Sequence, residues 1–240
     1  ATPIPRTLAM SAYGDLDTSV IDELPPGRTP IQTVTIPLDR REEVLQRIAS
    51  NCTEGKQVYW VCTLVEQSET LDAQAAEATF AEIKERFPEL NIGLVHGKMK
   101  ADEKQAVMQQ FKDNQIQLLI ATTVIEVGVD VPNASIMVIE NAERLGLSQL
   151  HQLRGRVGRG AKASFCALLY KNPLSQNGQE RLRIMRETND GFVIAEKDLE
   201  LRGPGELLGT KQTGDMGFRV AKLERDDHLL AQAHHVAQQI

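Results

Sequence analysis

Three arginines lie within six residues of one another in residues 152–159, which read Gln-Leu-Arg-Gly-Arg-Val-Gly-Arg. Arg156 and Arg159 are three residues apart, so in a helical turn their side chains project to the same side. A guanidinium group is always charged, and its planar fork of donors fits the oxygens of a transferring phosphate. The two intervening glycines keep bulk away from these forks. Together with Gln152, they favour phosphate chemistry over the alternative, which is a solvated basic turn.

A second candidate site lies in residues 118–132, where an apolar run ends in two threonines. The hydroxyl and main-chain N–H groups of Thr122 and Thr123 could bind the phosphate backbone of a nucleic acid. Gly128 permits a ligand to approach the main chain closely, and Asp130 is an acceptor suited to a ribose hydroxyl. The alternative is a plain strand-to-turn connection in which Asp130 is a turn residue.

His96 and Gly97 lie between an apolar run and a helical pattern, where they could contact a polyanion or form an ordinary turn. The other four histidines have no acidic or thiol partners at ligand spacing, so we expect no metal site. The chain also lacks a G-x-x-x-x-G-K-[ST] loop and an acid pair after a strand. Any phosphate cradle and magnesium ligands must therefore come from elsewhere.

The elements that position these residues follow from apolar periodicity. The predicted strands are 32–37, 57–64, 92–95, 117–122, 135–140 and 163–169, and the predicted helices are 40–51, 71–87, 101–112, 148–154, 179–188 and 192–201. Strands that alternate with helices indicate an α/β fold, with a parallel sheet flanked by helices. Functional loops lie at the carboxyl ends of such strands. We therefore expect His96, residues 122–132 and the arginine run along one edge, and the phosphate interpretation requires the arginines there.

Composition indicates an ordinary globular protein. Of the 240 residues, 41% are hydrophobic and 25% are charged, which gives ample material for a core. No apolar run approaches the roughly 20 residues of a membrane span, and no signal peptide opens the chain, so no membrane partner is expected. Three widely spaced cysteines are typical of free thiols in a reducing compartment, which predicts a cytoplasmic protein.

The charge is uneven along the chain. The formal net charge of −6 argues against a nonspecific nucleic-acid coat. Between residues 152 and 186, however, eight Lys and Arg residues accompany a single acid, Glu180. A local field that differs in sign from the bulk is what a binding surface needs.

The chain divides into three predicted parts. Residues 1–30 are rich in proline and look like the end of a preceding domain and a linker. Residues 31–171 form the α/β domain, and residues 172–240 form an appended helical subdomain with a glycine-rich loop. The chain begins without Met and stops within a helical pattern, so we expect a piece of something longer.

These motifs, in this order, resemble the second motor lobe of a superfamily 2 helicase. Residues 1–3 resemble the end of motif III, residues 122–132 motif V, and residues 152–159 motif VI. Residues 2–7, 149–159 and 198–206 (Asp-Leu-Glu-Leu-Arg-Gly-Pro-Gly-Glu) further resemble the RecG family of ATP-dependent DNA helicases, which remodel stalled forks. This resemblance implies a RecA-like sheet followed by a C-terminal helical hairpin.

The resemblance also implies roles for individual residues. Arg156 and Arg159 would reach the γ-phosphate of ATP as catalytic arginine fingers. The remaining implied roles are nucleotide binding for Gln152, Gly128 and Asp130, DNA contact for Thr122, Thr123, His96 and Gly97, and coupling of ATP turnover to translocation for Arg181, Arg202 and Gln212. ATP would be bound with Mg²⁺ whose ligands lie outside this chain.

The implied partners are branched double-stranded DNA (stalled forks and Holliday junctions in recombination and the repair of DNA damage) and the missing first motor lobe and wedge domain. The protein would work as a monomer, and this piece alone would not hydrolyse ATP. Two alternatives stay open. A transcription-repair coupling translocase shares the motor but binds RNA polymerase, and a non-catalytic α/β module could dock a partner through the acidic helix 71–87.

Overall fold

The computed structural model describes residues 30–63, 69–123, 130–160 and 163–202. The chain forms two compact units, one of which runs from Leu24 to Asp190 and contains the sheet. The other comprises Ala1–Glu23 and Gly191–Ile240, of which helix α7 (Gly191–Arg202) is described. The predicted C-terminal helical hairpin and glycine-rich loop involve residues beyond 202, which lie outside the described part.

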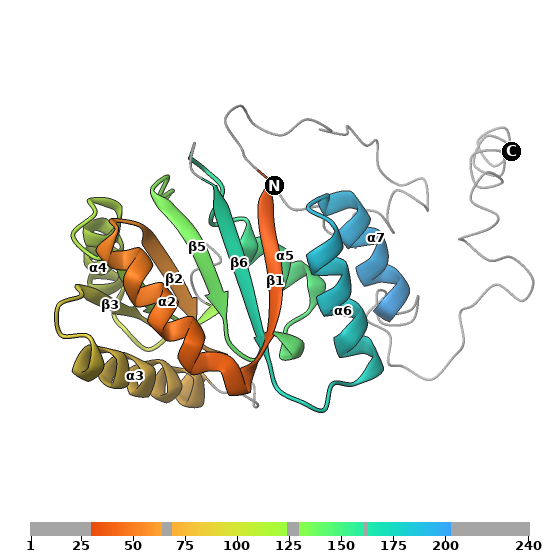
Figure 1. Ribbon diagram of the computed structural model, residues 1–240, viewed down its shortest axis with the longest axis horizontal. Helices are drawn as coiled ribbons and strands as arrows, with labels where there is room; N and C mark the ends of the chain where they lie inside the picture. The colour runs from red at the N-terminus through yellow and green to blue at the C-terminus, as the bar shows by residue number, and fades with distance from the viewer. Residues whose placement is uncertain (1–29, 64–68, 124–129, 161–162, 203–240) are drawn as a thin grey trace, which may run out of the picture. The chain divides into compact units, whose positions relative to one another are not determined.

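The larger unit is built on a six-stranded sheet with strand order β1-β6-β5-β2-β4-β3 (Figure 1). Every pairing in it is parallel. The strands are β1 (Ile31–Pro37), β2 (Gln57–Val61), β3 (Ile92–Val95), β4 (Leu118–Ala121), β5 (Ala134–Ile139) and β6 (Ser164–Tyr170). The α/β fold with a parallel sheet flanked by helices is therefore confirmed, and each predicted strand falls within a few residues of its place.

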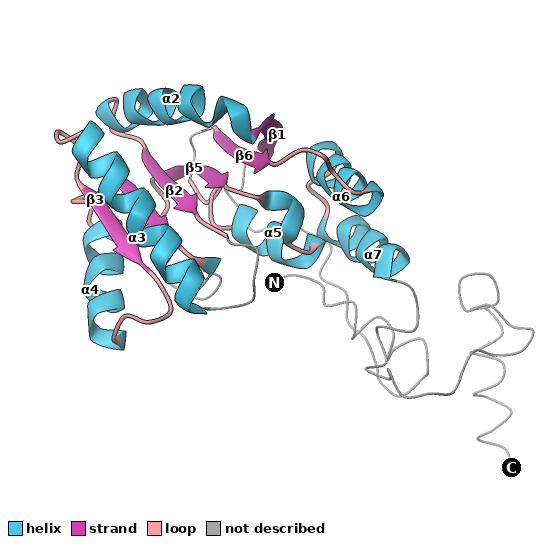
Figure 2. Cartoon of the chain, turned by 90° about the horizontal axis from the view of Figure 1, so that it is seen from below, coloured by secondary structure: helices cyan, strands magenta, loops and turns pink. Residues whose placement is uncertain are grey.

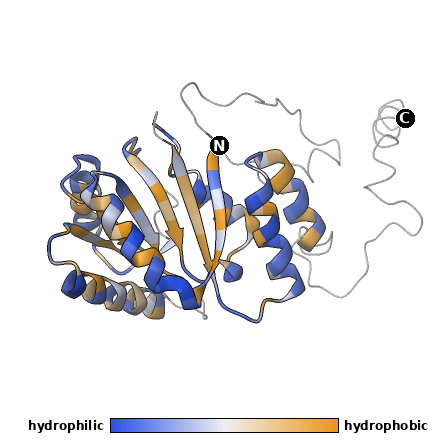
Figure 3. Cartoon of the chain, viewed as in Figure 1, coloured by the Kyte–Doolittle hydropathy of each residue, from blue (hydrophilic) through white to orange (hydrophobic). Residues whose placement is uncertain are grey.

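Helices cover both faces of this sheet (Figure 2). They are α2 (Arg41–Thr53), α3 (Glu69–Arg86), α4 (Ala101–Lys112), α5 (Leu147–Arg154) and α6 (Gln176–Glu187), with short 3-10 helices η1 (Leu38–Arg40) and η3 (Ala142–Arg144). Strands β2, β4 and β5 are buried throughout because neither of their faces meets water. Figure 3 shows apolar colouring along β5 and β6 and both polar and apolar bands along the helices.

Neighbouring residues of β2 show which helices lie on which face. Trp60 belongs to an apolar core shared with buried residues of α2 and α3. Tyr59 points the other way, and its ring meets Phe111 of α4 edge-on at a centroid distance of 4.9 Å. Thr33 of β1 is in register with this second face through β6 and β5, and it contacts Arg154 of α5. Helices α4 and α5 therefore lie on the Tyr59 face, and α2 and α3 lie on the Trp60 face.

The ends of the parallel strands lie along two opposite sides of the sheet. We call these sides the carboxyl edge, where the C-terminal ends of the strands lie, and the amino edge, where their N-terminal ends lie. His96 follows β3 and Thr122 follows β4, so both lie at the carboxyl edge. Residues 155–160 come after α5 and before β6, and Asp130 comes just before β5, so both lie at the amino edge. The expectation of a single edge is therefore wrong for the arginine run and for Asp130, and the condition set for the phosphate interpretation, arginines at the carboxyl edge, is not met. Any phosphate chemistry of these arginines must take place at the amino edge. A helix between two parallel strands returns the chain to the opposite edge, and α5 does so here.

The three cysteines are buried free thiols, as expected. Burial raises the pKa of the Cys52 and Cys166 thiols to about 12. The predicted divisions of the chain at residues 30 and 171 stay predictions, although α6, which was assigned beyond the second division, contacts β1.

Candidate functional site

Arg159 is held at the amino edge by two contacts. Its Nη1 donates to Asp130 Oδ1 at 2.9 Å, and its Nε donates to the Gly155 carbonyl at 3.1 Å. The Arg159 side chain is 26% exposed and that of Asp130 is 58% exposed. A pair so close to solvent adds about 1 kcal/mol or less to stability. The two contacts give Arg159 a defined position, and its side chain remains partly exposed to solvent.

Arg156 and Gln152 lie on the same segment as Arg159. Gln152 is half-buried on the last turn of α5, and Arg156 is half-buried just beyond it, where its N–H donates to the Leu153 carbonyl. Gly158 has a φ of 76°, a conformation that glycine adopts without strain, and it ends this helical turn before Arg159. Arg156 and Arg159 thus lie on a turn beyond the end of α5 and not on the helix itself.

The charges of Arg156 and Arg159 both act on the buried Tyr59. Burial raises the pKa of Tyr59 to about 12, and the charges of Arg156 and Arg159 act against that rise. The Tyr59 hydroxyl is therefore within electrostatic reach of both guanidinium groups. The amino edge consequently offers two positive charges and one carboxylate, Asp130, close to one another.

The third arginine of the run has a different role, which sequence reasoning missed. Arg154 is only 1% exposed. Its Nη1 donates to the carbonyls of Met185 at 2.7 Å and Thr188 at 2.9 Å, and to the Thr33 hydroxyl at 3.3 Å. These carbonyls belong to the end of α6, where a helix leaves acceptors unsatisfied and favours a cation. Arg154 therefore links α5 to α6. Burial lowers the pKa of its guanidinium, and the acceptors in these three hydrogen bonds are carbonyl and hydroxyl oxygens.

The sequence contained a signal for this role. Arg154 falls four residues after Leu150 and one turn beyond it on the buried face of α5. A charged residue on the apolar face of a short helix is more typical of an internal hydrogen-bonding role than of a ligand contact.

At the carboxyl edge, the predicted DNA-binding residues are more enclosed. The His96 side chain is 9% exposed, and its Nε2 lies 3.3 Å from Glu77 Oε1 of α3. The Gly97 carbonyl accepts from Lys104 Nζ at 3.0 Å. Thr122 is 3% exposed and its N–H donates to the Val95 carbonyl, so that donor is already used. The half-buried Thr123 is the more accessible of the two threonines.

The carboxyl edge is stabilised by residues that the sequence did not single out. The Thr63 hydroxyl donates to the Glu140 carbonyl at 2.6 Å, and Asn141 Nδ2 donates to the Thr63 carbonyl at 3.0 Å. These bonds join the chain after β2 to the chain after β5. Asn141 adopts φ 49°, a left-handed conformation in which Asn is enriched.

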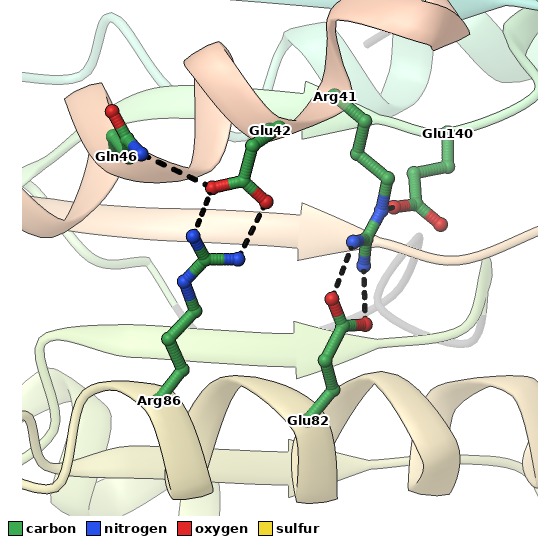
Figure 4. Close-up of polar contacts among 6 residues, drawn as sticks. All are labelled: Arg41, Glu42, Gln46, Glu82, Arg86 and Glu140. Atoms are coloured by element: carbon green, nitrogen blue, oxygen red, sulfur yellow. Dashed lines mark hydrogen bonds and ion pairs between the residues drawn. The ribbon is translucent and has the colours of Figure 1, made fainter.

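An ion-pair network joins this edge to the outer helices (Figure 4). Arg41 at the start of α2 pairs with Glu140 at 2.5 Å and with Glu82 of α3 at 2.8 Å, and its guanidinium lies 5.5 Å from the centre of the Trp60 ring. Arg86 of α3 binds Glu42 of α2 beside it. The network ties both helices of the Trp60 face to the end of β5.

The predicted coupling residues are only partly visible. Arg181 of α6 donates through Nη2 to the Glu143 carbonyl of η3 at 2.6 Å, which ties α6 to the segment after β5. Arg202 is the last residue of α7, and its side chain lies outside the described residues, as do Gly128 and Gln212. Among the residues that the structure describes, no group of three or more potential ligands could hold a metal ion. The search of these residues also found no helix long and apolar enough to cross a membrane.

Family models match two parts of the chain. Residues 40–161 match the helicase conserved C-terminal domain, and residues 188–240 match the model described as "ATP-dependent DNA helicase RecG, domain 3, C-terminal". The first match covers about half of the chain and includes β2 to β5, α5 and the arginine run. The predicted resemblance is therefore confirmed at the level of the family.

Individual relatives agree with these matches. The chain is 67% identical to RecG of Escherichia coli (strain K12) and 63% identical to RecG of Haemophilus influenzae, in each case over 100% of the chain and 35% of the relative. It thus spans about a third of the length of these relatives. A solved structure of RecG bound to a three-way DNA junction superposes with a TM-score of 0.74 at 46% identity, covering 96% of this chain and 30% of the other. Yeast Dbp5 bound to RNA and ADP BeF3 shares the fold, with a TM-score of 0.55 at 16% identity over 81% of this chain and 52% of the other.

Proposed function

The chain belongs to the helicase conserved C-terminal domain family, and from this premise we propose that it is the second motor lobe of an ATP-dependent DNA helicase of the RecG type. Its part in ATP hydrolysis is to supply Arg156 and Arg159 to a nucleotide bound mainly by the missing first lobe. The observation that carries this proposal is the partly exposed Arg159 at the amino edge, with Arg156 on the same segment.

At this edge the arginines act by neutralising charge. Bound ATP supplies the phosphoryl group that is transferred to water, and charge spreads over its oxygens as it leaves. Two guanidinium groups in fixed positions stabilise that charge, and arginine fingers of this kind contribute about 10³ to 10⁵ in rate. We assign Asp130 to accept from a ribose hydroxyl, and Gly128 and Gln152 to the same nucleotide site. Mg²⁺ would accompany ATP, with its ligands on the first lobe.

The carboxyl edge is the proposed DNA-binding side. His96, Gly97, Thr122 and Thr123 lie there, at the ends of β3 and β4. The RecG of the solved relative was bound to a three-way junction, which supports branched double-stranded DNA as the substrate, including stalled forks and Holliday junctions in recombination and repair. With the nucleotide and the DNA bound at opposite edges, ATP hydrolysis at one edge must change the DNA contacts at the other. Arg181, Arg202 and Gln212 are proposed to couple turnover to translocation along the duplex.

We further propose that the full-length protein works as a monomer in the cytoplasm, with its wedge domain supplied by the rest of the chain. Three free thiols support a reducing compartment. Contacts to phosphates would make DNA binding salt-dependent, with log K falling about linearly with log salt.

The proposal is tested by replacing each arginine in the full-length protein. Arg156→Ala and Arg159→Ala should each abolish ATP turnover and leave junction binding and secondary structure intact. Arg47→Ala, an exposed arginine on the outer side of α2, is the matched control and should keep normal turnover. Normal turnover in either Arg156→Ala or Arg159→Ala would contradict the assignment.

The two alternatives predict different partners. A transcription-repair coupling translocase would bind RNA polymerase, and a docking module would bind a protein through α3 without any dependence on nucleotide. The match of residues 188–240 to a RecG-specific model favours the RecG reading over both. Stable binding of the full-length protein to RNA polymerase, with no preference for branched DNA, would reverse that order.

A further inference from the structure

We propose that the loop of residues 130–133 is the positioning support of Arg159, acting through a main-chain contact at Gly160, and that Gln57 anchors this loop from inside the fold. Apart from Asp130, which is assigned to the nucleotide site, the supporting groups need not touch the nucleotide. The inference rests on the proposed function, because it concerns how the arginine finger is held. It assigns positioning roles to Gly160, Asn133 and Gln57.

The first support is a close main-chain approach. A Cβ atom added at Gly160 would lie 2.5 Å from the Pro132 carbonyl oxygen and 3.4 Å from its carbonyl carbon. The opposing atoms belong to the main chain, so no side chain can rotate away to make room. Only glycine lets the segment after Arg159 lie against residues 130–133. Together with the 2.9 Å pair between Arg159 and Asp130, this contact fixes the two segments relative to each other.

The second support is the anchor of that loop. Gln57, the first residue of β2, is fully buried. Its Nε2 donates to the carbonyls of Phe111 at 2.5 Å and Ile116 at 2.7 Å, and its Oε1 accepts from Asn133 Nδ2 at 3.1 Å. A buried amide with these donor and acceptor groups satisfied has one orientation, so Asn133 is held in place.

The chain of contacts therefore runs from the interior to the arginine finger. Gln57 fixes Asn133, the turn between the Val131 carbonyl and the Ala134 N–H fixes the loop, and Pro132 meets Gly160 next to Arg159. The exposed pair with Asp130 is too weak to set this position alone. Catalytic groups misplaced by about 1 Å can lose about 100-fold in rate, so the register at Gly160 matters for turnover.

The test uses the full-length protein with ATP and a branched DNA. Gly160→Ala should lower kcat for ATP hydrolysis by about 10- to 100-fold, with a much smaller change in KM and no change in junction affinity. The control is Gly178→Ala, which adds the same methyl group in α6 against the Ser175 side chain at 3.2 Å and should stay within about twofold of the wild type. Asn133→Ala removes the link to Gln57 without adding bulk, and it should give a smaller loss, about 3- to 10-fold.

A second arm separates positioning from general damage. Arg159→Ala should abolish steady-state turnover but leave a slow residual hydrolysis, which single-turnover measurements with enzyme in excess can follow. In that background, Gly160→Ala and Asn133→Ala should add less than about a twofold further loss. Losses that multiply in full, or a kcat of Gly160→Ala equal to the wild type, would overturn the inference. Either result differs from failure of the proposed function, which would appear as normal turnover in Arg156→Ala or Arg159→Ala itself.

Discussion

The two edges of the sheet hold their charged residues in different ways. At the amino edge, the ion pair between Arg159 and Asp130 has side chains that are 26% and 58% exposed. At the carboxyl edge, the pair between Arg41 and Glu140 has side chains that are 22% and 11% exposed, and Glu82 reinforces it. The two arginine side chains are almost equally exposed, so the pairs differ in their carboxylates: Glu140 is shielded from water, whereas Asp130 is close to solvent. A single sheet thus carries a shielded ion pair at one edge and a more exposed one at the other.

The strongest test of this comparison is Arg154, the buried arginine of the amino-edge run. Arg154→Met keeps the length of the side chain but leaves the Met185 and Thr188 carbonyls without their donor. We expect a loss of about 3 kcal/mol in the local stability of α6, because unsatisfied buried carbonyls are costly. Native-state hydrogen exchange of the α6 amides measures it. Arg47→Met on exposed α2 is the control and should change stability by less than about 0.5 kcal/mol.

Glu140→Gln comes next and tests the rigid frame. The change removes the charge that Arg41 meets at 2.5 Å while Glu82 still binds the same guanidinium. We expect a loss of about 2 kcal/mol, measured by hydrogen exchange of the β5 and α2 amides, because the pair is largely shielded from water. Glu42→Gln, which weakens the more exposed pair with Arg86, is the matched control and should cost less than about 1 kcal/mol. Equal losses in the two variants would contradict the distinction.

Apolar periodicity was enough to predict the sheet. Strand β3 and helix α4 fall at residues 92–95 and 101–112, as predicted, because each is a clean periodic segment between polar turns. The placement of the sites was less successful. Residues 122–132 begin at the carboxyl edge and end at the amino edge. The arginine run follows α5 in the chain and therefore lies at the amino edge, whereas a segment that precedes the helix would lie at the carboxyl edge. Chain order contains that information, but motif recognition alone does not use it.

The role of Arg154 depended on tertiary contacts. Its acceptors include Thr33, which is 121 residues away, and two carbonyls at the end of α6. Within residues 152–159 both Arg154 and Arg156 are arginines beside glycine, and the only local signal that sets Arg154 apart is its spacing from Leu150 on the buried face of α5. Burial, rather than residue type, separates the fastening arginine from the proposed catalytic pair.

The buried thiols of Cys52 in α2 and Cys166 in β6 give a pH-dependent prediction for the stability of the fold. Cys52 and Cys166 have a pKa of about 12 in the folded protein, because burial disfavours the thiolate. Because the pKa is higher in the folded state, the unfolded chain loses the thiol proton first as pH rises. The free energy of unfolding is therefore unaffected by these thiols below the unfolded pKa near 9, and it falls as pH rises above that value. Each thiol should cost about 1.4 kcal/mol of stability at pH 10 relative to neutral pH.

Denaturant titrations at pH 7.5 and pH 10 measure this loss, and Cys166→Ala should recover one thiol's share of it. Iodoacetamide provides a second readout, since native Cys52 and Cys166 should react at pH 8 at least about 100-fold more slowly than in the unfolded chain. Rapid labelling of the native protein would show that these thiols are not enclosed.

The smallest expected effect is on the amino-edge pair itself. Asp130→Asn removes the carboxylate that binds Arg159 at 2.9 Å, yet both side chains are close to solvent. We expect a loss of less than about 1 kcal/mol in the hydrogen-exchange stability of β5, and we expect raising the salt concentration to 1 M to remove it, because exposed charges are screened over about 3 Å at that strength. The Glu140→Gln loss should persist in the same salt, since its charges are shielded from mobile ions. If salt affected both variants alike, the two edges would hold their charges by the same physics, and the accessibility of Arg159 would need another explanation.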